Sequence, residues 1–495
     1  MNQAAVAAAE PAEIFGHPRG LATLFLTEMW ERFSYYGMRA LLILFMVDAT
    51  RGGLGLTDET AAAIYGLYTA AAYLVALPGG WIADRLWGAQ RSIWVGGILI
   101  MCGHFVLALP RAGTFFLGLI LVVLGTGLLK PNVSAIVGAL YAKGDPRRDS
   151  GFTLYYFGIN LGATLGQTIC GLLALLNWHY GFAAAGVGML LGLVQFRLTL
   201  GSLGPAGVAP ASPPTPKLRT ISWSVVFAAI VVVLTLLVAA VEGVVRLDAV
   251  LLAQGTAWAL FIGAILYFGV VFVTGRLTAD ERKRMIVLLV LCLCSVLFWA
   301  GFEQAGSSFN LFADRYTDRV VLGFEIPTTW LQNLNPIFIL LLAPFFSAFW
   351  IALARRNLEP AAPAKFAFGL LLLGIGTAVM IGAAALVASG EQVLPTWLAL
   401  TYLFHTMGEL SLSPVGLSTT TKLAPPRFVG QMMGMWFLCT ALGLVLAGLF
   451  AGRFRADALG EWPGLYTQLA LASIALGVLL LLFSRPLRRL MGNAA

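Results

Sequence analysis

The chain has 495 residues, of which 59% are hydrophobic and only 11% are charged, and its mean hydropathy is +0.86. This composition excludes a soluble globular protein and predicts many membrane-spanning helices. The formal net charge of +8 is therefore interpreted through membrane topology, and no nucleic-acid partner is expected. All five cysteines lie in apolar segments, which favours packing thiols over a disulfide framework.

Apolar runs separated by Gly, Pro and charged residues predict fourteen spans. The first six are expected near residues 21–48, 58–83, 91–110, 114–141, 150–176 and 182–202. A Pro-rich stretch at 203–220 is interpreted as a linker, and two further spans follow near 221–243 and 248–275. The last six are expected near 284–310, 328–354, 365–389, 393–421, 428–452 and 464–484.

The sequence thus predicts an all-α integral membrane protein with a six-two-six order of helices. An N-terminal bundle is expected at 21–202, a two-helix insertion at 221–275 and a C-terminal bundle at 284–484. Residues 1–20 and 485–495 are expected to be cytoplasmic tails. The N-terminal stretch is Ala-rich and polar and does not resemble a cleavable signal peptide, so the first span is expected to remain as an anchor.

The distribution of Lys and Arg predicts the orientation. With the N-terminus inside, the cytoplasmic loops and tails hold 21 of the 31 basic residues, and three more lie within spans. The outer loops hold seven, namely Arg51, Arg111, Arg246, Arg315, Arg319, Arg453 and Arg455. Because positive charge accumulates on the cytoplasmic side, this bias predicts that both termini are cytoplasmic. The expected location is the inner (plasma) membrane.

The first span carries four charges in the stretch EMWERFSYYGMR, residues 28–39. At 100° per residue, the side chains of Glu28, Glu31, Arg32, Arg39, Tyr35 and Tyr36 share an arc of about 140°. A charge at the bilayer centre costs roughly 2.5–3.5 kcal/mol. The charged face is therefore expected to meet a wet cavity or partner helices. A structural salt-bridge knot is the alternative interpretation.

This stretch resembles the E-x-x-E-R-F-x-Y-Y signature of the proton-dependent oligopeptide transporters, a branch of the major facilitator superfamily. The resemblance implies two six-helix bundles with a substrate site between them near the midplane. The extra pair of helices resembles the insertion of bacterial members. The short connection at 389–393 implies that the large outer domain of animal members is absent.

Further motifs in the N-terminal half resemble the same family. The segment GGWIADRLWGAQR at 79–91 is similar to the loop motif of the superfamily, and Asp84, Arg85 and Arg91 are assigned to gating structure at the membrane edge. A plain positive-inside loop is the alternative. YYFGINLG at 155–162 matches F-Y-x-x-I-N-x-G except that Tyr155 replaces Phe, and it supplies Tyr156 and Asn160.

Lys130 directly precedes Pro131 deep in the fourth span. A buried ammonium group requires an anion, which is expected to be a carboxylate of another helix or of a ligand. Tyr73 in the second span matches an aromatic position of the family. Without the resemblance it would be interpreted as a packing residue.

The C-terminal half supplies the opposite charges. Trp299 and Glu303 share a face of the seventh span, and Asn335 precedes Pro336 in the eighth. The segment from Glu409 through Ser418, which includes Ser413, resembles E-x-x-x-S-P-x-G-L-S, and Trp436 matches a family aromatic. His405 and His104 are expected to be hydrogen-bonded core imidazoles rather than proton carriers.

Together, the residues and the resemblance predict a proton-coupled symporter that imports di- and tripeptides by alternating access. Glu28, Glu31, Arg32 and Glu303 are assigned to proton coupling and gating. Substrate contacts are assigned to a larger set, which comprises Arg39, Tyr35, Tyr36, Tyr73, Lys130, Tyr156, Asn160, Trp299, Asn335, Glu409, Ser413 and Trp436. Lys130 and Arg39 are expected to receive the peptide carboxylate, whereas Glu409, Asn160 and Asn335 receive its amine.

Two alternatives retain the fold. One is a proton-coupled carrier of nitrate, another small anion or an amino acid, although Glu409 argues against a pure anion carrier. The other is a nutrient sensor without flux, although no soluble signalling domain is evident. An enzyme is not expected, because no nucleophile–base set or metal-ligand cluster is present. Protons are the only expected coupling agent, no other cofactor is expected, and the protein is expected to be monomeric.

Overall fold

The computed structural model describes residues 13–14, 16–142, 145, 147–210, 214–241, 244, 247–321 and 323–492. Several predicted features lie outside these residues. They are residues 1–12 of the N-terminal tail, residues 211–213 of the linker, residues 493–495 of the C-terminal tail, and two basic residues of the charge count, Lys143 and Arg246.

The N-terminal half is helical at each of its six predicted spans. Its elements are α1 (Arg19–Val47), α2 (Asp58–Leu74) extended by α3 (Ala76–Ile82) and the π-helical turn η1 (Ala83–Trp87), α4 (Ala89–Leu107), α5 (Ala112–Ala139), α6 (Arg147–Leu176), and α7 (Trp178–Thr199) with the 3-10 turn η2 (Leu200–Leu203). A short antiparallel hairpin, β1 (Glu13–Ile14) and β2 (His17–Pro18), precedes α1.

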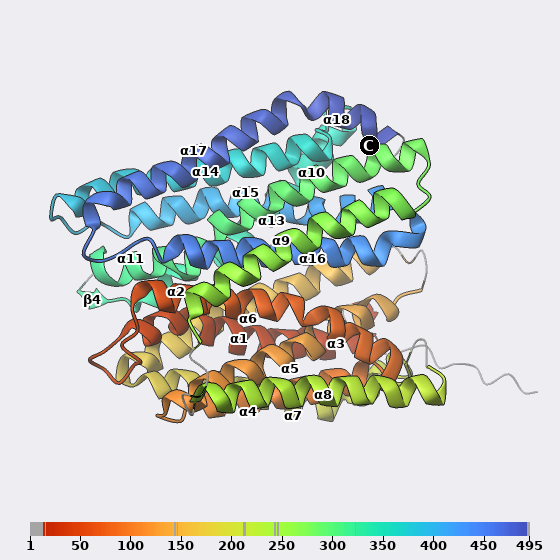
Figure 1. Cartoon of the computed structure of the whole chain (residues 1–495), viewed down its shortest axis with the longest axis horizontal. Coiled ribbons are helices and arrows are strands. Elements are labelled where there is room, and N and C mark those ends of the chain that lie inside the picture. Colours follow the sequence, from red (N-terminus) through yellow and green to blue (C-terminus); the bar gives the residue numbers. More distant parts are fainter. Residues whose placement is uncertain are drawn as a thin grey trace, which may run out of the picture.

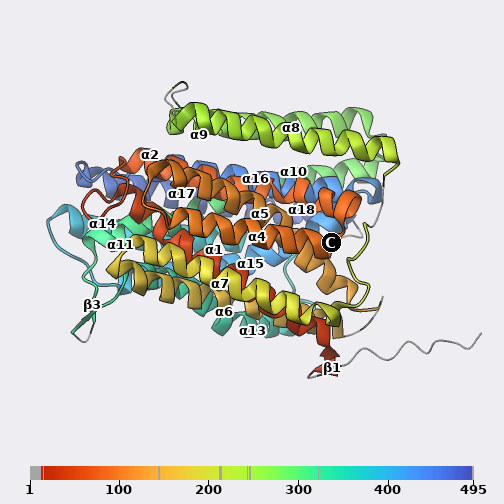
Figure 2. The ribbon, with the colours of Figure 1, turned by 90° about the horizontal axis from the view of Figure 1, so that it is seen from below.

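Two long helices, α8 (Pro216–Val241) and α9 (Ala249–Thr274), occupy the predicted insertion. α8 begins inside the stretch that the sequence assigned to the linker, so that boundary is wrong by several residues. Pro216 is the first residue of α8, where a missing N–H costs nothing because no carbonyl of the helix would accept from it. Figure 2 shows α8 and α9 along one side of the remaining helices, and Figure 1 shows the two separated from each other across that side.

The C-terminal half is built around the remaining six spans. Its elements are α10 (Ala279–Phe302), η3 (Glu303–Gly306), α11 (Ser308–Tyr316), the hairpin β3 (Val320–Val321) and β4 (Phe324–Glu325), α12 (Thr328–Gln332), α13 (Leu334–Arg355), α14 (Ala362–Ala388), α15 (Thr396–Leu423), η4 (Pro426–Phe428), α16 (Val429–Ala451), η5 (Leu459–Glu461), α17 (Trp462–Leu482) and α18 (Ser484–Met491). α18 lies in the predicted tail, and its residues Leu487 and Met491 are buried.

Eleven helical segments among the described residues are long and apolar enough to cross a membrane. Helices at the other three predicted spans are also long, since α1 has 29 residues, α8 has 26 and α15 has 28. In α1 the four predicted charges interrupt the apolar sequence. The described residues therefore contain a long helix at every predicted span.

Figure 1 shows α1–α7 gathered on one side of the molecule and α10–α18 on the other. α2 and α16 pack closely where the two groups meet, because Gly66 and Gly448 face each other. A Cβ atom added to Gly66 would lie 3.0 Å from the Cα of Gly448. Glycines at such a contact allow two backbones to approach within a membrane.

Polar contacts join the two groups of helices at the end that carries the loops 48–57, 317–327 and 389–395, which we call the outer end. The guanidinium of Arg315 donates two hydrogen bonds of 2.7 Å to Asp58, and Asn310 donates to the carbonyl oxygen of Ala40. Trp330 donates to the carbonyl oxygen of Thr168. Among the described residues, no side-chain hydrogen bond joins the same two groups at the opposite end.

Candidate functional site

A cavity of about 130 Å³ lies between the two groups of helices. Nine of the predicted site residues line it: Tyr36, Arg39, Tyr73, Tyr156, Asn160, Trp299, Glu303, Asn335 and Glu409. They come from α1, α2, α6, α10, η3, α13 and α15. Side chains that were predicted from distant parts of the chain therefore meet at one cavity.

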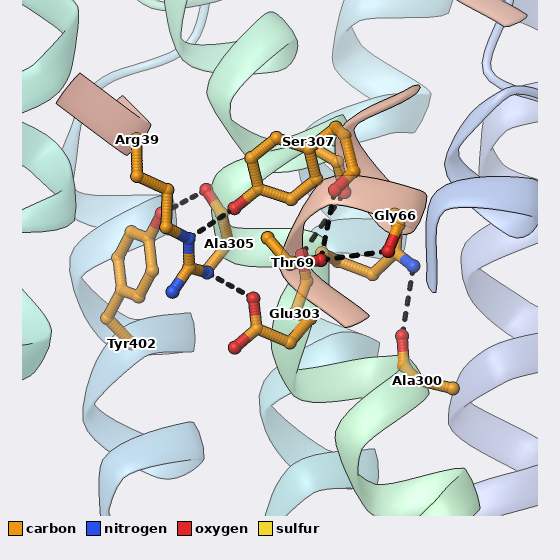
Figure 3. Close-up of polar contacts among 10 residues, drawn as sticks. Arg39, Gly66, Thr69, Ala300, Glu303, Ala305, Ser307 and Tyr402 are labelled. Carbon is orange, nitrogen blue, oxygen red and sulfur yellow. Dashed lines mark hydrogen bonds and ion pairs between the residues drawn. The ribbon is translucent and has the colours of Figure 1, made fainter. Parts of the chain in front are cut away.

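An ion pair closes the cavity toward the outer end. Arg39 in α1 pairs with Glu303 in η3, and Figure 3 shows the guanidinium facing the carboxylate. The Nε of Arg39 donates a second hydrogen bond of 2.6 Å to the hydroxyl of Tyr65 in α2. Arg39, assigned to substrate contact, and Glu303, assigned to proton coupling, thus meet in one ion pair.

The backbone around this ion pair requires glycine. A Cβ atom on Gly306 would lie 1.7 Å from the Tyr65 hydroxyl oxygen and 3.3 Å from Nη2 of Arg39. Beside it, the hydroxyl of Tyr402 donates to the carbonyl oxygen of Ala305 at 3.3 Å (Figure 3). The turn η3, which follows α10, therefore packs tightly against helices of both halves.

A carboxylate with amide and hydroxyl neighbours lies on the C-terminal side of the cavity. The amide nitrogen of Asn335 donates to Oε2 of Glu409 at 3.1 Å and to the hydroxyl of Thr406 at 3.0 Å. Across the cavity, Asn160 donates to the carbonyl oxygen of Tyr156, one turn earlier in α6. Asn160 therefore keeps its amide oxygen available to a ligand. The Glu409 carboxylate offers a site for a cationic group.

The remaining charges of the first span form a buried cluster of Glu28, Glu31 and Arg32. Nε of Arg32 lies 2.7 Å from Oε1 of Glu28 and 2.9 Å from Oε2 of Glu31. One guanidinium thus faces two carboxylates. Oε2 of Glu28 and Oε1 of Glu31 are buried and have no hydrogen-bond partner among the described residues. Such unpaired oxygens are costly in a membrane interior unless a proton or a cation satisfies them.

Lys130 is not among the residues that line the cavity. Its ammonium group lies 4.1 Å from the centre of the Tyr73 ring, a cation–π distance, and Tyr73 itself lines the cavity. The described residues offer Lys130 no carboxylate within ion-pair distance. Of the two predicted anions, the carboxylate of another helix is therefore not found among the described residues, and the ammonium group contacts the Tyr73 ring.

Three other predicted substrate contacts lie outside the cavity lining. Tyr35 is buried and stacks on Tyr68. Trp436 packs edge-to-face on Phe366, and its ring occupies the space where Gly416 lacks a side chain. Ser413 lies four residues beyond Glu409 in α15 and is only partly buried. In this structure Tyr35 and Trp436 serve helix packing.

The loop motif that was assigned to gating structure is exposed. Asp84 and Arg85 lie in η1, Arg91 lies in the first turn of α4, and all three side chains are exposed. None of them makes an ion pair or a side-chain hydrogen bond within the described residues. The motif lies at the end of the molecule where the two groups of helices share no side-chain hydrogen bond.

The two histidine predictions have different outcomes. His405 is buried and its Nε2 lies 3.2 Å from the hydroxyl of Thr377, as expected for a hydrogen-bonded core imidazole. The prediction is wrong for His104, whose two ring nitrogens are buried without a partner among the described residues.

Sequence reasoning missed several residues that line the cavity or its closure: Tyr65, Gln167, Phe302, Gln332 and Tyr402. Gln167 follows Asn160 by seven residues, which is two helical turns on the same face. That spacing was a usable signal. Tyr65 and Tyr402 carried no such signal, because a single tyrosine in an apolar helix is typical of packing.

Comparison with known proteins places this arrangement in a family. A model described as the POT family matches residues 90–459. The chain belongs to the POT family. It is 44% identical to the peptide transporter YePEPT of Yersinia enterocolitica, over 97% of this chain and 96% of the relative. It is 37% identical to a di-/tripeptide transporter of Lactococcus lactis, over 97% of both chains.

The fold of the chain is also that of the POT family. A crystal structure of the peptide transporter POT in complex with sulfate superposes with a TM-score of 0.91 and 41% identity, and the match covers 98% of both chains. The predicted all-α major facilitator fold is therefore confirmed. So is the prediction that the chain is a multi-pass membrane transporter and not an enzyme.

Proposed function

We propose that this member of the POT family is a proton-coupled symporter that imports di- and tripeptides by alternating access. The observation that carries the proposal is a cavity lined on one wall by Arg39, which pairs with Glu303, and on the other by the carboxylate of Glu409, which has no cationic partner among the described residues. A zwitterionic peptide has one anionic and one cationic end, so it complements such a cavity. The relatives named above as peptide transporters support the same substrate class.

The ion pair of Arg39 with Glu303 supplies a route for coupling. It lies at the outer closure and also borders the cavity. Protonation of Glu303 would remove the attraction that holds the outer end closed. The buried cluster of Glu28, Glu31 and Arg32 is the second candidate for a proton site, because two carboxylates share one guanidinium. We assign the coupling proton to these carboxylates and propose no other cofactor.

The remaining assignments follow from the same proposal. Arg39 receives the peptide carboxylate, and Lys130 joins it when Tyr73 moves aside. Glu409, Asn335 and Asn160 receive the amine. We further propose that the protein is a monomer in the plasma membrane and that both of its termini are cytoplasmic, as the distribution of basic residues predicts.

Uptake of a labelled dipeptide into liposomes that contain only this protein tests the proposal. An inwardly directed proton gradient should drive accumulation, and a protonophore should abolish it. An inside-negative potential should add about 2.3 kcal/mol per net charge per 100 mV. Protein-free liposomes serve as the control. Accumulation that is indifferent to both gradient and protonophore would reject symport, and nitrate uptake without peptide uptake would favour the anion carrier.

A further inference from the structure

A second cavity lies among the C-terminal helices, between α13, α14 and α15. Its volume is about 440 Å³, and its walls are aromatic and aliphatic side chains such as Phe349, Phe368 and Leu372. Ser411 also lines it, but its hydroxyl donates to the carbonyl oxygen of Met407 at 2.9 Å. The walls therefore offer nothing to a polar solute.

The lining of this cavity extends over much of one leaflet of a bilayer. From Phe368 to Ile375, the lining residues of α14 span about 10 Å at 1.5 Å per residue. The hydrocarbon core of a bilayer is about 30 Å thick, so one leaflet is about 15 Å. Phe345, Phe349 and Ile351 of α13 are exposed beside the opening. The cavity therefore opens toward hydrocarbon and runs from the membrane edge toward the midplane.

Basic groups surround its edge. Arg355 and Arg356 end α13, are exposed, and have no acidic partner among the described residues. Lys365 lies in the first turn of α14, is only 9% exposed, and its ammonium group lies 4.7 Å from the centre of the Trp350 ring. Among the described residues it pairs only with Glu359, at 2.5 Å. The positive charge at this edge therefore exceeds the negative charge.

Trp350 lines the cavity with its ring. Its Nε1 is buried and has no acceptor among the described residues, so this donor does not face the cavity. The contribution of Trp350 to the cavity is therefore apolar.

We propose that this cavity binds one anionic phospholipid of the cytoplasmic leaflet. An acyl chain fills the apolar cavity and contacts the Trp350 ring, and the phosphate lies at the edge, where it contacts Arg355, Arg356 and Lys365. Basic pockets between transmembrane helices on the cytoplasmic side are suited to lipid headgroups. The choice of leaflet depends on the orientation proposed above, and the site is separate from the peptide cavity.

The site is connected to transport through two helices. α13 contributes Asn335 to the peptide cavity and Phe349 to the lipid cavity, and α15 contributes Glu409 and Ser411 in the same way. A bound acyl chain would therefore hold the C-terminal half of α13 against α14. The lipid thus stabilises the arrangement of helices that this structure shows.

Native mass spectrometry of the full-length protein tests the binding. After exchange from mixed phosphatidylglycerol and phosphatidylcholine, the wild type should retain one phosphatidylglycerol. Ser411→Phe fills the cavity and should reduce that retention at least tenfold. Leu471→Phe, on the exposed face of α17, is the matched control and should have no effect. Retention of no lipid by the wild type, or equal retention by Ser411→Phe, would overturn the proposal.

The headgroup is tested with single charge removals. Arg355→Gln and Arg356→Gln should each weaken the preference for phosphatidylglycerol about fivefold, which corresponds to about 1 kcal/mol per basic residue. Arg197→Gln, which removes an exposed arginine of α7, should leave the preference unchanged. Equal retention of both lipids by the wild type would refute an anionic ligand.

Fluorescence provides a test that does not require a cavity-filling variant. Phospholipids brominated along the acyl chain should quench a tryptophan component that is present in the wild type and absent in Trp350→Phe. Phosphatidylglycerol should quench it at lower mole fraction than phosphatidylcholine. A quenching curve that is identical for the wild type and Trp350→Phe would show that no chain lies in the cavity.

Discussion

The ion pair of Arg39 with Glu303 is well shielded, since the two side chains are 12% and 7% exposed. Removal of one partner from such a pair leaves an unpaired buried charge, at a cost of about 3–5 kcal/mol. We therefore expect Arg39→Gln and Glu303→Gln each to reduce gradient-driven dipeptide uptake at least tenfold. The double variant should be much less impaired than the product of the two single effects. Initial rates in liposomes provide the cycle.

An exposed outer arginine provides the reference for this cycle. Arg111→Gln removes a positive charge at the outer end without touching the pair, and uptake should remain unchanged. If the effects of Arg39→Gln and Glu303→Gln simply multiply, the two residues do not act as a pair in transport.

Glu409 offers a second prediction, which concerns the orientation of the peptide. Acetylation of the peptide amine should weaken binding to the wild type strongly, because a carboxylate held by Asn335 would lose its cationic partner. In Glu409→Gln most of that penalty should vanish, whereas the penalty for C-terminal amidation should persist. Competition binding with free, acetylated and amidated dipeptide measures both. Loss of the amidation penalty in Glu409→Gln would reverse the proposed orientation.

At the scale of single residues, the sequence predicted the charged and amide residues of the cavity better than its aromatic residues. Charges and amides in apolar helices were reliable guides, because lipid cannot satisfy them and they must face a partner or a cavity. This reasoning predicted Arg39, Glu303, Asn335 and Glu409. Aromatic residues were ambiguous, since the same tyrosine or tryptophan can line a cavity or fill a core. Trp436 is an example of the second case.

At the scale of helices, the contact of α2 with α16 depends on two glycines. A Cβ atom on Gly66 would lie 3.0 Å from the Gly448 Cα and 3.0 Å from the Leu444 carbonyl oxygen, so Gly66→Ala should separate the helices. Overpacking of this kind costs about 1–3 kcal/mol, and thermal unfolding in detergent should show a lower midpoint. Gly255→Ala in α9 meets open space and should be neutral or slightly stabilising. Equal midpoints for the two variants would exclude a tight contact.

Hydropathy predicted that the membrane-spanning helices exist, but it did not predict the residues at which they begin and end. Every predicted span overlaps a long helix, because apolar length is what a bilayer demands. The start of α8 was placed too late because a proline-rich stretch can still end in the first turn of a helix. α18 was missed since an eight-residue segment with three arginines has too few apolar residues for a span, although it buries Leu487 and Met491.

At the scale of the whole molecule, the outer end is closed by two ion pairs that connect the halves. The second pair, Arg315 with Asp58, is bidentate and part-buried. It lies outside the peptide cavity, so it contributes to closure without contacting the substrate. A pair of this exposure contributes about 1 kcal/mol, which changes the ratio of closed to open molecules about fivefold.

Loss of the pair of Arg315 with Asp58 should therefore open the outer end more often. Asp58→Asn should shift the population toward an open outer end, and Arg315→Gln should do the same. Spin labels at Arg111→Cys and Glu391→Cys lie on exposed outer loops of the two halves, with the exposed Cys102 replaced by Ser. Pulsed electron resonance should then show more of the longer distance in both variants than in the labelled wild type. Arg453→Gln removes an outer arginine that contacts Gln468 within the same half and should leave the distribution unchanged.

A charge exchange distinguishes the ion pair from a general effect of mutation at the outer end. Asp58→Arg combined with Arg315→Asp restores opposite charges, so the longer distance should diminish again. The recovery should be incomplete, because position 58 lies in the first turn of α2, where the helix dipole disfavours a cation by about 0.3–1 kcal/mol. If the exchanged protein is as open as the single variants, Arg315 and Asp58 do not hold the halves together by their attraction. The outer closure would then depend on Arg39 with Glu303, on the amide hydrogen bond from Asn310 and on the indole hydrogen bond from Trp330.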